Sequence, residues 1–118
     1  MKWRLVLPDG FSVWLTSVPR ESADALLGAL KAITKESNGP KELVMPQVEI
    51  HVVPEEAPTL YRMKILMVEP TIGVLYGLRG SMIVVGAWGD LQKLLKHTTM
   101  KEAQDLIGQF TEVKYGKV

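Results

Sequence analysis

The chain has 118 residues, of which 47% are hydrophobic and 23% charged, and its formal net charge is +1. This composition is typical of one globular domain and excludes a disordered chain, while the low net charge provides no global attraction to nucleic acid or anionic lipid. The absence of cysteine excludes disulfides, thiolate metal sites and a cysteine nucleophile.

The first predicted element is a β-hairpin over residues 3–15, turning at Pro8-Asp9-Gly10. A three-residue turn puts only apolar side chains on one face of this hairpin: Trp3, Leu5, Leu7, Phe11, Val13 and Leu15. A two-residue turn shifts the register by one residue and mixes the faces, so the three-residue turn is favoured. Trp14 then lies beside Val6 on the other, polar face.

The longest predicted helix runs over residues 21–36. Leu26, Leu30 and Ile33 recur in it at helical spacing, and Ser22 is the expected N-cap.

Four strands are predicted in the centre of the chain. Residues 47–53 and 60–69 alternate between apolar and polar side chains, which indicates half-exposed strands. Residues 72–78 and 82–88 are almost continuously apolar, which is typical of strands buried on both faces. A turn at Arg79-Gly80 joins the last two.

Two short helices are predicted at the end of the chain. Asp90 is the expected cap of the first, and Thr99 with Glu102 forms a capping-box pattern for the second.

Together these elements predict an α+β fold. We expect a single domain over 1–118, with a mostly antiparallel sheet of five to seven strands, one long helix packed on a face and two short C-terminal helices. Its parts are the N-terminal hairpin plus helix (1–39), a strand-rich centre (43–88) and a helical tail (90–110).

The opening resembles the first half of a ubiquitin-like β-grasp domain. The matching features are the "PDG" turn, the alternation on both arms and the apolar face of the helix that follows. The rest departs from that pattern, because four strands and two helices follow and the chain ends "KYGKV" without a terminal Gly-Gly. The resemblance therefore implies neither conjugation nor sulfur transfer, and no family is assigned.

The favoured function is that of a small non-catalytic binding or regulatory protein that acts through protein contacts, with homodimer formation included. Its support is mainly negative, because the sequence contains no nucleophile–base pair, no metal-ligand set and no phosphate loop. The candidate partner surface is Trp14 with Val6 and Arg4 on the polar face of the hairpin, because tryptophan is enriched in binding hot spots. The favoured explanation of Trp14, however, is that the second half of the chain covers this face. No cofactor is expected.

A nucleic-acid-binding accessory protein is the second hypothesis. Arg62 and Lys64 lie on one strand face, and Arg79 lies in the Gly77–Gly80 segment, a GxxG pattern like the loop with which KH domains clamp a nucleic-acid backbone. An ordinary hairpin turn explains the same residues.

A small enzyme is the third hypothesis. His51 and Glu49 share the polar face of one strand, with Glu55 beyond its end, and such a cluster could serve acid–base or metal chemistry. A solvated strand face explains the same pattern, so a non-catalytic role is favoured and no metal is assigned.

The expected location is the cytoplasm, without membrane contact. The opening segment lacks a secretory signal pattern, and the longest apolar run is far too short for a membrane span.

Overall fold

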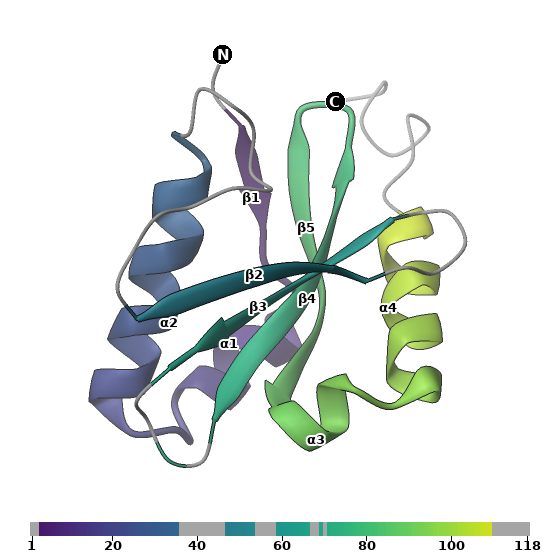
Figure 1. Ribbon diagram of the computed structural model, residues 1–118. Helices are drawn as coiled ribbons and strands as arrows, with labels where there is room; N and C mark the ends of the chain where they lie inside the picture. Colours follow the sequence, from purple (N-terminus) through teal and green to yellow (C-terminus); the bar gives the residue numbers. More distant parts are fainter. Residues whose placement is uncertain (1–2, 36–46, 54–58, 67–68, 70, 110–118) are drawn as a thin grey trace.

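The computed structural model describes residues 3–35, 47–53, 59–66, 69 and 71–109. The elements in chain order are β1 (Arg4–Val6), α1 (Asp9–Leu15), α2 (Arg20–Ile33), β2 (Val48–Val53), β3 (Leu60–Ile65), β4 (Ile72–Arg79), β5 (Met82–Asp90), α3 (Leu91–Leu94) and α4 (His97–Gln109). The predicted α+β class is confirmed: a mixed sheet of five strands lies between α1 and α2 on one side and α3 and α4 on the other (Figure 1).

The strands are ordered β1-β5-β4-β3-β2 across the sheet. Strands β2 to β5 pair antiparallel with their neighbours in the chain, whereas β1 pairs parallel with β5, with Arg4 opposite Met82. The two edges of the sheet are therefore the three-residue β1 and the six-residue β2.

The predicted N-terminal hairpin is wrong, because residues 9–15 form α1 and β1 pairs with β5 instead. Phe11, Trp14 and Leu15 are spaced for one face of a helix, and Pro8 and Asp9 suit a helix start as N-cap and first-turn acid. Val13, predicted to face the core, is 70% exposed. The resemblance to a β-grasp opening, which depends on the hairpin, does not hold.

The side of the sheet covered by α1 and α2, here called the α1/α2 face, carries the larger apolar cluster. From the helices it contains Phe11, Leu26, Ala29, Leu30 and Ile33, and from the strands Val48, Met63, Ile65, Ile72, Val74, Tyr76, Ile83 and Val85. The Phe11 ring lies 5.8 Å, centroid to centroid, from Trp14 in the same helix and from Trp88 of β5, so the Phe11–Trp88 pair joins α1 to the sheet.

The opposite side, here called the α4 face, is covered by α3 and α4 over β4 and β5. A Cβ on Gly86 would lie 2.8 Å from the Ala103 carbonyl oxygen, and one on Gly77 would lie 2.9 Å from Ile107 Cδ1. Side chains at these two positions would hold α4 away from the sheet, so the glycines permit its close approach.

Several helix ends differ from the prediction. α2 begins at Arg20, one residue before the predicted start, and its N-cap is Pro19 rather than Ser22, which is buried. Asp90 is confirmed as the cap of α3, accepting from the Lys93 amide at 2.9 Å. The capping box at Thr99 is wrong, since α4 begins at His97 and buries Thr99. With 13 residues, α4 is nearly as long as the 14 residues of α2, so the tail does not consist of two short helices.

In the described part of the chain, no helix combines the length and apolar character needed to span a membrane.

Candidate functional site

A small polar cluster lies on the α4 face, on β2 and β3, away from the ends at Val53 and Leu60 that pack in one cluster with residues of α4. Val48 and Ile50 of β2 point to the α1/α2 face, so the alternating residues Glu49 and His51 point to the α4 face. The strand register places Lys64 of β3 directly opposite Glu49. Glu49 Oε1 accepts a hydrogen bond from His51 Nε2 and lies 3.3 Å from Lys64 Nζ. The predicted pairing of Glu49 with His51 is therefore formed.

The electrostatics of this cluster favour an ionised Glu49. Its hydrogen bonds with His51 first, and with Lys64 second, hold the pKa of the carboxyl group below its ordinary value. The Glu49 and His51 side chains are 40% and 45% exposed, so water screens both groups. The arrangement is a solvent-facing ion cluster rather than a dry catalytic pair.

The residues described show no third metal ligand beside this cluster. Glu55, the third member of the predicted polar set, lies outside the described residues, and no three His, Asp or Glu side chains within those residues gather closely enough to hold a metal ion.

The predicted nucleic-acid contacts are only partly brought together. Arg62 lies opposite His51 in β2 and shares the α4 face with Lys64. Arg79 lies on the same face at the far end of β4, but Ile107 of α4 packs over Gly77 between them. The Gly77–Gly80 segment ends a strand and enters the β4–β5 turn, so it is not a loop between two helices as in a KH domain.

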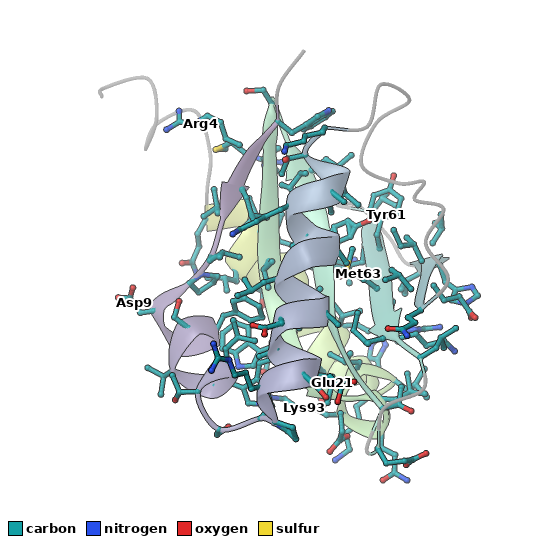
Figure 2. All side chains as sticks on the ribbon, turned by 90° about the vertical axis from the view of Figure 1, so that its left-hand side faces the viewer. Arg4, Asp9, Glu21, Tyr61, Met63 and Lys93 are labelled. Atoms are coloured by element: carbon teal, nitrogen blue, oxygen red, sulfur yellow. The ribbon has the colours of Figure 1, made fainter. Side chains whose placement is uncertain are left out.

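Aromatic groups do not join these cations. Tyr61 lies on the α1/α2 face, where its ring stacks on Tyr76 at 5.5 Å (centroid to centroid) and where burial raises the pKa of the Tyr76 hydroxyl. Figure 2 shows Tyr61 and Met63 to one side of α2, with Arg4 to the other. Nucleic-acid platforms combine stacking and basic groups on one surface, whereas Tyr61 and the Arg62–Lys64 pair lie on opposite faces of β3.

Arg62 has one unusual feature. Its Nε is buried and has no hydrogen-bond partner among the described residues. An unsatisfied polar atom of this kind costs about 1–3 kcal/mol.

The predicted partner surface around Trp14 is not one patch. Trp14 is partly buried and packs against the cluster on the α1/α2 face, whereas Val6 packs against the cluster on the α4 face. Arg4 is exposed in β1, two residues before Val6. The helical conformation of residues 9–15 separates Trp14 from Val6, because the hairpin would have placed both on one face.

A shallow cleft of about 300 Å³ lies where α1 meets α2. Trp14 and the buried Ser22 line one side, and Glu69 and Asp90 line another. Asp90 already caps α3, so one of the two carboxylates has a structural partner. The cleft lies on a different part of the molecule from the Glu49–His51 pair, which shares none of its lining residues.

The feature that sequence analysis missed is the outer edge of β2. Among the described strands β2 is the last of the sheet, and Val52 is 59% exposed beside half-buried Ile50. The alternation of residues 47–53 predicts the strand and its faces, but no local signal indicates that it occupies an edge. Apolar side chains on an edge strand that lacks proline are a mark of contact surfaces.

Comparison with known proteins adds no relationship to this description: no family model, no curated protein and no solved structure matches the chain.

Proposed function

We propose that the chain is a non-catalytic protein-binding module whose contact surface is the outer edge of β2. The observation that supports this most is a six-residue edge strand whose outer side pairs with no other described strand and carries exposed Val52 next to Ile50. Such an edge is a template for a strand from another protein, because backbone hydrogen bonds supply affinity and alternate side chains supply specificity. Glu49 and His51 add charged groups on the other face of the same strand.

The two alternatives have weaker support. An enzyme using His51 and Glu49 needs a concave site around them, but their side chains are 45% and 40% exposed and neither lines the cleft between α1 and α2. A nucleic-acid platform needs aromatic and basic groups together, but Tyr61 and Arg62 lie on opposite faces. A regulatory role and a cytoplasmic location stay predictions.

Quantitative affinity capture from extracts of the source cells tests the proposal. Val52→Lys puts a cation on the edge of β2, and because Val52 is exposed the variant should fold. Gln92→Lys, at an exposed position of α3, is the matched control. We expect specific partners to be depleted about tenfold with Val52→Lys and retained with Gln92→Lys. Equal recovery with all three chains would contradict the proposal.

A further inference from the structure

The hydrogen-bond pattern of β2 determines which of its backbone groups reach the free edge. The Leu66 amide donates to the Gln47 carbonyl oxygen at 2.8 Å, so Gln47 directs its backbone groups toward β3. In an antiparallel ladder, successive residues point both backbone groups alternately toward the neighbouring strand and away from it. Val48, Ile50 and Val52 therefore direct their N–H and C=O groups outward.

These three residues are spaced so that β2 can pair with a copy of itself. When a two-fold axis passes through Ile50, Ile50 lies opposite Ile50 of the second copy, and Val48 lies opposite Val52 of the second copy. Each outward-directed residue then faces another one and exchanges two hydrogen bonds with it, about six in all. The exposed Val52 becomes covered by an apolar neighbour.

The charged residues select this register over its neighbours. An axis through Glu49 would place two carboxylates opposite each other, and an axis through His51 would place two imidazoles opposite each other. With the axis at Ile50, each Glu49 lies opposite His51 of the second copy, in the closely spaced positions where side chains interact most strongly. A shift of one residue would set apolar Ile50 against polar His51, on opposite faces.

From this complementarity of hydrogen bonds, apolar side chains and charge, we infer that the partner of the β2 edge is a second copy of this chain, bound antiparallel across a two-fold axis at Ile50. The two sheets become one continuous sheet of both copies, and the α1/α2 faces of the copies lie on the same side. This inference rests on the proposed function, because it names the partner of the same edge.

Single cysteine variants test the register, since the chain has no cysteine of its own. In the proposed dimer the two Ile50 Cα atoms lie about 5.5 Å apart, within the range that a disulfide spans. Two Val52 residues would lie about 13 Å apart along the strands, which a disulfide cannot span. Val52→Cys is thus a matched control on the same strand and face, and it is more exposed than Ile50→Cys.

Oxidised glutathione is the oxidant, and covalent dimer is measured on non-reducing gels. We expect Ile50→Cys to cross-link on the order of tenfold faster than Val52→Cys. A mixture of Val48→Cys and Val52→Cys should also cross-link, because these positions face each other. Far-UV circular dichroism of the reduced variants shows whether each is folded. Equal rates for Ile50→Cys and Val52→Cys would overturn the register.

Sedimentation equilibrium of the wild-type chain tests the dimer itself, because a monomer has a mass of 13.1 kDa. We expect twice this mass. Glu49→His alone should weaken the dimer about 2- to 30-fold, and adding His51→Glu in the same chain should restore it, because each carboxylate again faces an imidazole. Failure of the second substitution to restore the dimer would overturn the charge argument.

The outcomes separate this inference from the proposed function. A wild-type chain that stays monomeric at every concentration overturns the second-copy inference, while capture of other proteins that depends on Val52 still supports edge binding. Conversely, a dimer cross-linked at Ile50 supports the inference and edge binding together, whereas a chain that stays monomeric and loses no captured partner with Val52→Lys contradicts both.

Discussion

Replacing Phe11 with alanine should destabilise the fold more than any other change in α1. Phe11 is fully buried, and its ring lies 5.8 Å from the rings of Trp14 and Trp88. Phe→Ala substitutions in cores cost about 3–5 kcal/mol, and each aromatic pair is worth about 0.5–1.5 kcal/mol beyond its buried area. We therefore expect the free energy of unfolding to fall by about 4 kcal/mol. For a chain of this length the Tm should fall by about 15 °C.

Urea unfolding, followed by tryptophan fluorescence and circular dichroism, measures the effect. Val13→Ala is the matched control, because Val13 lies two residues away in the same helix and is 70% exposed. Its effect should stay below about 0.5 kcal/mol. In a hairpin Phe11 and Val13 would both face the core, so a comparable loss from both variants would refute the helical assignment of residues 9–15.

Three further predictions follow from single contacts. Gly73→Ala should destabilise the fold by about 3 kcal/mol or more, since a Cβ there would lie 2.1 Å from the Met63 carbonyl oxygen, whereas Gly28→Ala, with open space around it, should stabilise α2 by about 0.4–1 kcal/mol. Chemical unfolding of both variants checks the opposite signs. Asp90→Ala should lower the free energy of unfolding by about 0.5–2 kcal/mol and Asp90→Asn by much less, because the cap of α3 needs a side-chain oxygen. Equal Tm values for the two variants would contradict this prediction. The pKa of Glu49 is lowered in the folded chain, so its contacts should stabilise the fold above the pKa of the unfolded chain and cease to do so as the pH falls through the folded pKa. The free energies of urea unfolding of wild type and Glu49→Gln should therefore become equal in acid. A difference that persists at the lowest pH would contradict a lowered pKa of Glu49.

The error at the N-terminus shows what a local pattern leaves undecided. Phe11, Val13 and Leu15 alternate as in a strand, while Phe11, Trp14 and Leu15 have the spacing of a helix face. Trp14 is the residue that the hairpin places on a polar face, and this misfit is the signal that favours the helix. The ladder partner of β1 lies in β5, and no pattern within the first 15 residues indicates that a distant strand is available.

The candidate site could likewise be predicted only in part from the sequence. Strand alternation alone places Glu49 and His51 on one face, and this pairing is present. The contact with Lys64 depends on which strand lies beside β2, and the free edge depends on the order of all five strands. The Lys64 contact and the edge position depend on how the whole sheet assembles, so the sequence of one strand predicts neither of them. The separation of Arg79 from Arg62 likewise cannot be predicted without the position of α4, because Ile107 of α4 lies between them.

The parallel pairing of β1 with β5 also has a consequence for the order of folding. Strands β2 to β5 form a meander of neighbours, whereas Arg4 must find Met82, which is synthesised long after it. Closing so long a loop is entropically unfavourable, and such distant pairings form slowly. On the ribosome, β1 and α1, which contact β5, therefore cannot complete their packing until β5 has been synthesised, whereas α2 also contacts the earlier strand β3. In pulse-labelled refolding, the amides of β1 should gain protection from exchange after those of β3 and β4.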